Sequence, residues 1–228
     1  MYNFLKLRNI ILNKNNKIMK NIIEILKNKY SENEPISIQD IRLALPEYTR
    51  GRIYQIIDEL EDKGQLKRFD QGIYYIPKKT IFGDSVLDPR KIINKKYITD
   101  GENNYGYYTG IALLNAFGIS TQSANIVEIR TNNESTNKRT VCIGKQQVII
   151  KKSRAELNND NYAAMMILEL FSLITASEID SKDFSQVIEF AREKNLTSDK
   201  ILQYAKDMPA KAAKNFIVSE VNNVLASR

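Results

Sequence analysis

The sequence predicts an α+β protein in three parts: an N-terminal module of helices and a hairpin, a small α/β unit, and a C-terminal helical bundle. Three observations support this prediction. Between Pro35 and Pro77 the chain reads as a short helix, a turn, a longer helix and two strands. Between Gly106 and Lys152 it carries one apolar helix and three strand-like segments. From about residue 156 onward the apolar residues follow helical spacing throughout.

The chain begins with two apolar segments. The apolar residues from Lys17 to Tyr30 lie on one broad stripe, which predicts an amphipathic helix packed on a core. Residues 2–12 are also rich in Leu, Ile and Phe and are expected to form an extra helix or an arm, unless they fray. Ser37 is expected to cap the next helix, and Pro46 to end it. The apolar side of that helix is expected to carry Ile38, Ile41, Leu43 and Leu45.

Thr49 is expected to cap a third helix that runs to about Lys63, with Gly64 as its left-handed stop. Strands are then expected over Gln65–Phe69 and Ile73–Ile76, joined by a turn at Asp70–Gly72. The core face of the third helix follows the i, i+3, i+4, i+7 rule at Ile53, Ile56, Ile57 and Leu60. This order of elements is that of a winged helix-turn-helix, a module that inserts one helix into the major groove of DNA.

Charge along the third helix indicates which half would face DNA. Its second half carries Asp58, Glu59, Glu61 and Asp62, which phosphates would repel. Arg52 and Gln55 are predicted to read guanine and adenine edges, whereas Thr49 and Arg50 are better placed for phosphate. The predicted DNA-binding residues are Thr49, Arg50, Arg52, Tyr54 and Gln55 on the helix and Lys67, Arg68 and Gln71 on the wing.

Residues 78–89 are interpreted as a linker, with the first domain over 1–80 and a second over 81–228. The second domain is divided into an α/β part (81–155) and a helical part (156–228). Thr109 is expected to cap an apolar helix that ends at Gly118. Strands are expected over 126–131, 140–143 and 147–152, and helices over 162–175, 184–194, 198–206 and 210–225.

Composition excludes several classes of function. The chain has no histidine and one cysteine, so the commonest general base and a transition-metal site are both missing. No glycine-rich phosphate loop occurs. The sequence therefore predicts a protein that is not an enzyme and holds no metal or cofactor. No apolar run reaches a membrane span, and a lone Cys142, expected to be an inert strand residue, suits the cytoplasm. The net charge of +7 favours nucleic acid only weakly.

The second region carries a family resemblance. The segments NYGYYTGIALLNAFGISTQ, IVEIRTN and IIKKSR follow the winged module in that order. With that module they resemble the AbiEi-type antitoxins of bacterial abortive-infection, type IV toxin–antitoxin systems. The resemblance implies a transcriptional repressor that binds an inverted repeat in its own promoter. It also implies an antitoxin that neutralises a nucleotidyltransferase-like toxin, without requiring direct contact with it. It places DNA binding on Thr49–Gln55 and the wing, and antitoxin activity after about Ile81. The acidic, fully helical last third departs from a strict match.

Some interpretations stay open at this point. Lys151, Lys152 and Arg154 are either second phosphate contacts or a solvated strand end. Tyr105, Tyr107 and Tyr108 either stack on bases or a nucleotide, or are half-buried packing residues. The alternative function is a ligand-sensing winged-helix regulator, favoured by a pocket beside Tyr107, Tyr108 and the Met165–Met166 helix or by a dimer built on the C-terminal helices. A nucleotide-processing enzyme would need clustered carboxylates in a cleft.

Overall fold

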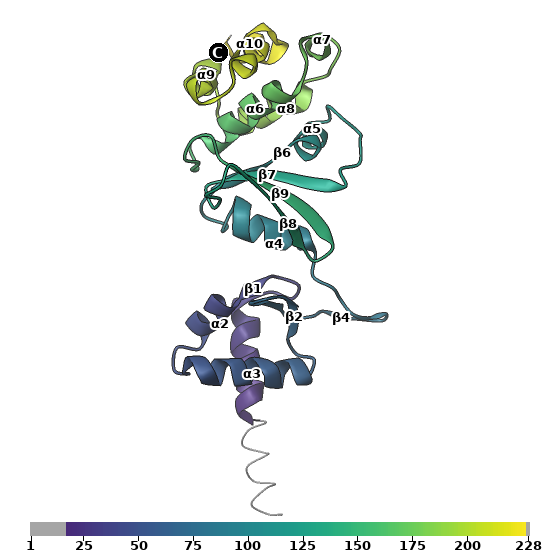
Figure 1. The fold of residues 1–228 in the computed structure, drawn as a ribbon, viewed down its shortest axis with the longest axis vertical. Helices are drawn as coiled ribbons and strands as arrows, with labels where there is room; N and C mark the ends of the chain where they lie inside the picture. The colour runs from purple at the N-terminus through teal and green to yellow at the C-terminus, as the bar shows by residue number, and fades with distance from the viewer. Residues whose placement is uncertain (1–16, 227–228) are drawn as a thin grey trace, which may run out of the picture. The chain divides into compact units, whose positions relative to one another are not determined.

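A computed structural model describes residues 17–226 and shows a mixed α+β protein. The chain divides into two compact units, Met1–Ile92 and Ile93–Arg228 (Figure 1). This division lies beyond the boundary expected after residue 80, because residues 81–92 belong to the first unit. The predicted segment 2–12 lies outside the described residues.

The first unit combines helices with a three-stranded antiparallel sheet of order β1-β3-β2. Its first helix is described over residues 17–29. The elements that follow are β1 (Ile36–Ser37), α2 (Ile38–Ala44), α3 (Arg50–Asp62), β2 (Lys67–Asp70) and β3 (Ile73–Tyr75). The first strand, although only two residues long, pairs with β3, so the hairpin is joined to the chain that precedes α2.

Helices α2 and α3 begin after the capping residues predicted from the sequence. The Ser37 hydroxyl accepts a hydrogen bond from the Asp40 N–H at 3.1 Å, and the Asp40 carboxylate accepts from the Ser37 N–H at 2.8 Å. This reciprocal capping box satisfies two N–H groups that a helix start leaves unpaired. Thr49 caps α3 by accepting from the Arg52 N–H at 3.4 Å.

The end of α3 confirms the predicted glycine stop. Gly64 adopts φ 62°, its N–H donates to Glu61 O at 2.8 Å, and the Gln65 N–H donates to Leu60 O at 2.9 Å. These two bonds define a Schellman motif, which turns the chain out of the helix into β2.

The core of the first unit forms where the first helix, α2 and α3 bury their apolar faces against the sheet. The four core residues predicted for α3, namely Ile53, Ile56, Ile57 and Leu60, are all buried. Leu43 differs from its prediction: it was placed on the apolar side of α2, but 75% of it is exposed. The helix buries Ile41 and Ala44 instead, and Leu43, two residues after Ile41, points to the opposite side of the helix.

A second hairpin occupies part of the segment interpreted as a linker. It consists of β4 (Lys79–Thr80) and β5 (Gly83–Asp84). Ser85 fixes its base: its hydroxyl accepts from the Lys78 N–H at 2.9 Å, and its carbonyl accepts from the Tyr75 hydroxyl at 3.2 Å. Period-2 patterning does not reveal so short a pair, because each strand has only two residues.

The second unit is built on a four-stranded mixed sheet of order β6-β7-β9-β8. Its strands are β6 (Gly106–Thr109), β7 (Ile126–Thr131), β8 (Lys138–Ile143) and β9 (Gln146–Lys152). The central pair, β7 and β9, is parallel, and both outer pairs are antiparallel. The π-helix η1 (Asn94–Ile98), which follows α4 (Pro89–Ile93), packs against β6 and β7. Helix α5 (Ile111–Ala116) packs against the same two strands, and α6 (Tyr162–Leu173) packs against β6; α5 and α6 lie on the opposite side of the sheet from η1 (Figure 1).

The expected cap of α5 was wrong. Thr109 is the last residue of β6, is buried, and donates its hydroxyl proton to Glu169 Oε1 at 2.8 Å. The helix begins at Ile111, after Gly110 turns the chain with φ 63°. A hydroxyl that pairs with a carboxylate far along the sequence leaves no local signal to distinguish it from a cap.

The C-terminal part is helical, as expected, but more finely divided. After α6 the helices are α7 (Ala176–Ile179), α8 (Ser185–Glu193), α9 (Ser198–Leu202), the 3₁₀ turn η2 (Ala205–Asp207), α10 (Ala210–Val218) and α11 (Glu220–Ala226). The single helix expected over 210–225 breaks at Ser219, which is buried and extended and donates its hydroxyl proton to Phe216 O at 2.7 Å. The break lets Phe216 and Val221 both reach the core.

Gly106 provides a test of the packing at β6. A Cβ at this position would lie 1.9 Å from Tyr97 O and 2.8 Å from Arg130 O. We expect Gly106→Ala to lower the free energy of unfolding by about 3 kcal/mol or more, the upper range of overpacking costs. Urea denaturation followed by circular dichroism measures this change. Gly51→Ala is the control, because a Cβ there meets nothing within 4 Å and alanine favours helix by about 0.5–1 kcal/mol. Equal stability of the two variants would contradict the close approach.

Candidate functional site

The first two turns of α3 present polar side chains to solvent. Burial of Ile53, Ile56 and Ile57 on one side directs the opposite side outward. Among the predicted DNA-binding residues, Thr49, Arg50, Tyr54 and Gln55 are all exposed. The Arg50 guanidinium lies 6.0 Å from the centre of the Tyr54 ring, near the outer limit of a cation–π contact. The structure therefore leaves all four residues accessible at the start of α3.

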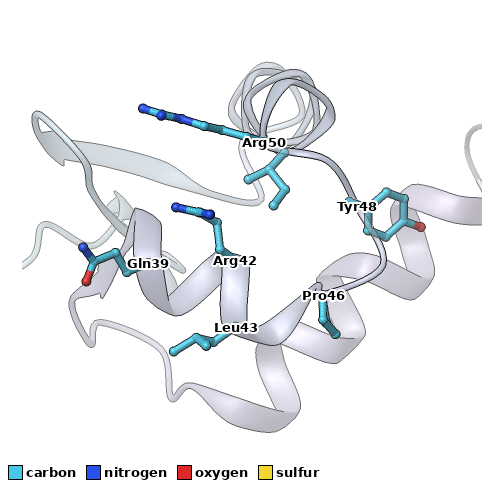
Figure 2. A pocket seen from close by; sticks show the side chains of 7 residues that line it. Gln39, Arg42, Leu43, Pro46, Tyr48 and Arg50 are labelled. Carbon is cyan, nitrogen blue, oxygen red and sulfur yellow. The ribbon is translucent and has the colours of Figure 1, made fainter.

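A groove of about 430 Å³ separates this surface from α2. It is lined by Gln39, Arg42, Leu43, Pro46, Tyr48, Arg50 and Ile53. Figure 2 shows the Arg42 and Arg50 side chains extending from the two helices into the same region. Neither arginine forms an ion pair with the described residues, so two guanidinium charges stand beside each other without a local counter-charge. The sequence pattern does not indicate Gln39 and Arg42, because their place beside α3 depends on how the two helices cross.

Arg52 is more constrained than its neighbours. Its Nη1 atom donates to Glu59 Oε1 at 2.9 Å and to Gln55 Oε1 at 3.1 Å. The side chain is 32% exposed, so it is accessible but already occupied. A base or phosphate that bound the Nη1 atom of Arg52 would compete with Glu59, which lies about two turns further along the helix.

The two cations of the β2–β3 hairpin, like Arg52, are ion-paired. Lys67 Nζ lies 2.9 Å from Asp84 Oδ2, and Arg68 Nη2 lies 3.1 Å from Glu61 Oε2. Arg68 also stacks over the Tyr74 ring, 5.4 Å from its centre. Gln71 is exposed at the turn, where its N–H is held by the Asp70 side chain at 2.7 Å. Ion pairing thus offsets the charges of Lys67 and Arg68, whereas Arg42 and Arg50 form no ion pair with the described residues.

In the second unit the three basic residues at the end of β9 have different surroundings. Lys151 is ion-paired with Glu128 on the neighbouring strand. Lys152 is exposed, and its carbonyl accepts from Arg130 Nη1 at 3.2 Å. Arg154 lies on the bend after the strand and reaches Glu169 Oε2 at 3.5 Å. The three residues therefore do not form one solvated cluster.

A buried charge cluster joins the sheet to α6. Glu169 is 2% exposed and accepts from Arg130 Nε at 2.8 Å, Thr109 Oγ1 at 2.8 Å and Arg154 Nε at 3.5 Å. Burial alone would raise the pKa of Glu169, but Arg130, Thr109 and Arg154 outweigh it and hold the pKa below its usual value. The pairing of Arg130 with Glu169 could not be predicted from the sequence, because Arg130 lies on β7 and Glu169 lies on α6.

The tyrosines of β6 alternate between packing environments. Tyr107 is buried in the core of the second unit with Met165, and the Tyr108 hydroxyl donates to Asn94 Oδ1 at 2.7 Å.

Among the described residues no group of three or more acidic or cysteine side chains is placed to hold a metal ion. Cys142 is exposed on β8 rather than packed.

The fold and this surface define an α+β protein with an arginine-bearing groove beside an exposed helix start. The chain belongs to a family of unknown function, DUF6088, whose sequence model matches residues 43–198. The matched region runs from the end of α2 to the start of α9, and so includes α3 and the mixed sheet. A search of curated proteins finds no match. No helix in the described part of the chain is long and apolar enough to cross a membrane.

The Glu169 cluster predicts a pH dependence of stability. A carboxylate whose pKa is lowered by folding stabilises the protein above its unfolded pKa, and this contribution is lost as pH falls through the folded pKa. We expect Glu169→Gln to cost about 3 kcal/mol at pH 7, because it leaves buried guanidinium charge uncompensated. The deficit relative to wild type should shrink as pH falls below the ordinary value of 4.5.

Urea denaturation at a series of pH values measures the difference between the two proteins. Glu189→Gln on α8 removes an exposed carboxylate from the same unit and should change stability little. A deficit that stayed constant down to pH 3 would show that the charge of Glu169 is not what stabilises the cluster.

Proposed function

We propose that this protein is a DNA-binding transcriptional repressor and an antitoxin of a type IV toxin–antitoxin system. In this proposal the first unit is a winged helix-turn-helix that represses its own operon. The second unit, with no individual residue nominated, neutralises a nucleotidyltransferase-like toxin. The family resemblance described above is the basis for the antitoxin part, and the geometry of the first unit is the basis for the DNA-binding part.

The topology of the first unit supports the winged-helix part of the proposal. In that module a strand between the first two helices joins the sheet, and a hairpin follows the third helix. The sheet order β1-β3-β2 matches this arrangement, with β1 between the first helix and α2, and with β2 and β3 after α3. Helix α3 then corresponds to the recognition helix.

The single observation that carries the DNA-binding proposal is the accessible start of α3 beside Arg42. Recognition helices dock with their N-terminal turns in the groove, and guanidinium groups bind phosphate oxygens in pairs. Arg50, Tyr54 and Gln55 are exposed on those turns. Arg42 adds a second charge from α2, the helix that crosses the DNA backbone in this class of module. We therefore assign Arg42 and Arg50 to phosphates and Gln55 to a base edge.

The proposal predicts a measurable salt dependence. The test uses a duplex that spans the region directly upstream of the protein's own gene, with a scrambled duplex of the same length as reference. Each phosphate contact contributes about 0.9 to the slope of log affinity against log salt. We expect Arg42→Ala with Arg50→Ala to weaken binding to both duplexes and to reduce the slope by roughly 2. Fluorescence anisotropy at several salt concentrations provides both values.

Lys27→Ala is the matched control for this measurement. It removes one positive charge from an exposed position on the first helix of the same unit. We expect it to leave the slope almost unchanged, because charges outside the interface release few counterions. If Lys27→Ala and the arginine variants had equal effects, binding would depend on net charge alone, and the groove would not be the interface.

The antitoxin part predicts growth rescue. A nucleotidyltransferase-like protein encoded beside this gene should arrest growth when expressed alone and should be neutralised by co-expression of this protein. Because the proposal assigns the two activities to different units, the Arg42→Ala, Arg50→Ala variant should still rescue growth from a foreign promoter. Colony counts with and without the second protein measure the effect. Failure of the wild-type chain to rescue would contradict the antitoxin assignment and leave the DNA-binding proposal standing.

A further inference from the structure

We propose that the second unit contains a binding site for the phosphate group of a small phosphate monoester, such as a nucleoside monophosphate. The site is a groove of about 330 Å³ beside the ends of β7 and β9. It is lined by Asn132, Lys152, Ser153, Arg154, Ala155 and Glu156. This inference does not depend on DNA binding by the first unit.

Arg154 supplies more positive charge than Glu169 needs for its neutralisation. Glu169 already accepts hydrogen bonds from Arg130 Nε at 2.8 Å and from the Thr109 hydroxyl at 2.8 Å. Arg154 adds only a long contact through Nε, at 3.5 Å. One buried carboxylate therefore faces two guanidinium groups, and the cluster keeps an excess of one positive charge.

The exposure of the two arginines shows where that excess charge lies. The Arg130 side chain is 12% exposed, whereas that of Arg154 is 31% exposed and lines the groove. Its contact with Glu169 uses Nε and holds the guanidinium in position, which leaves both Nη groups to donate. A guanidinium fixed through one edge presents a fork of N–H groups that matches phosphate oxygens.

The backbone of the bend supplies further donors. The N–H groups of Ser153 and Leu157 are occupied, by Thr131 O at 3.0 Å and Asn132 Oδ1 at 2.9 Å. Between them, the N–H groups of Arg154, Ala155 and Glu156 form no hydrogen bond with the described part of the chain. Successive N–H groups on a bend whose two ends are fixed make a concave surface that favours anions.

A buried hydroxyl beside the cluster adds a further polar group. Tyr107 is 2% exposed, and its hydroxyl has no hydrogen-bond partner among the described residues. Burial raises the pKa of Tyr107, the charge of Glu169 raises it further, and Arg130 and Arg154 oppose this rise. The hydroxyl therefore lies within electrostatic reach of all three charged groups. An unpaired hydroxyl inside a core is costly, so Tyr107 is a polar group near Arg154 that the described residues leave unsatisfied.

The shape of the groove favours a monoester over a nucleic-acid backbone. All but one of its lining residues come from a single short segment, residues 152–156, so it accommodates one phosphate group rather than a row of them. Glu156 lies on the same lining and would repel the neighbouring phosphates of an extended chain. A terminal phosphate offers three oxygens to the Arg154 fork and the free N–H groups without bringing further charge close to Glu156.

Isothermal titration calorimetry on the full-length protein tests this site. The probes are inorganic phosphate, adenosine 5′-monophosphate, adenosine, and a short single-stranded oligonucleotide with free hydroxyl ends. We expect phosphate and the monophosphate to bind, and adenosine and the oligonucleotide to bind at least about tenfold more weakly, because they lack the doubly charged group. Arg154→Ala should raise the dissociation constant of the monophosphate by about tenfold or more, and Arg154→Lys by less.

Lys145→Ala is the matched control, because it removes an equal charge from an exposed position just before β9, whereas Arg154 follows that strand. Affinity for the monophosphate should be unchanged in this variant and in Arg50→Ala, which separates this site from the first unit. Absence of phosphate binding by the wild-type protein would overturn the proposal. Equal affinities of wild type and Arg154→Ala, or binding of the oligonucleotide alone, would overturn it as well.

Discussion

The burial of one side of α3 is the constraint on which the candidate DNA-binding surface depends. Ile53, Ile56 and Ile57 are at most 2% exposed, and each successive residue of a helix turns by about 100°. Once these side chains are fixed in the core, the directions of Arg50, Tyr54 and Gln55 follow without further interactions. The cap at Thr49 and the glycine stop at Gly64 then set where the exposed face begins and ends.

The charges on that face are sorted by local pairing. The acidic second half of α3 provides partners for Arg52 and Arg68, so these two arginines contribute little net field. Surface ion pairs contribute little to stability, but an arginine that is already paired is less available to bind phosphate. Arg42 and Arg50, which lie away from the acidic half, keep their charge. The acidic residues therefore offset the charges of Arg52 and Arg68 and leave those of Arg42 and Arg50 in the α2–α3 groove without an ion-pair partner among the described residues.

Local signals in the sequence predicted the first unit well, whereas contacts between distant residues could not be predicted. Ser37, Thr49 and Gly64 act within one helical turn, and each lies where the sequence indicated. The role of Arg42 required knowledge of how α2 crosses α3, and the partner of Thr109 lies 60 residues away. The break at Ser219 was also hidden, since the apolar pattern on both sides of it fits one helix. The winged-helix interpretation and the antitoxin assignment remain proposals.

The two units handle charge by opposite means. In the first unit the ion pairs lie at the surface, where water screens them and a competing anion can displace one partner. In the second unit Glu169 is buried, and removal of Arg130 would leave a charge that water cannot reach. Breaking the Arg130–Glu169 pair would therefore cost more than breaking an ion pair at the surface. Arg154 has a longer contact with Glu169 than Arg130 has, and its side chain is more exposed. Arg154 can therefore bind a ligand while the Arg130–Glu169 pair still joins the sheet to α6. The buried Arg130–Glu169 pair thereby positions Arg154.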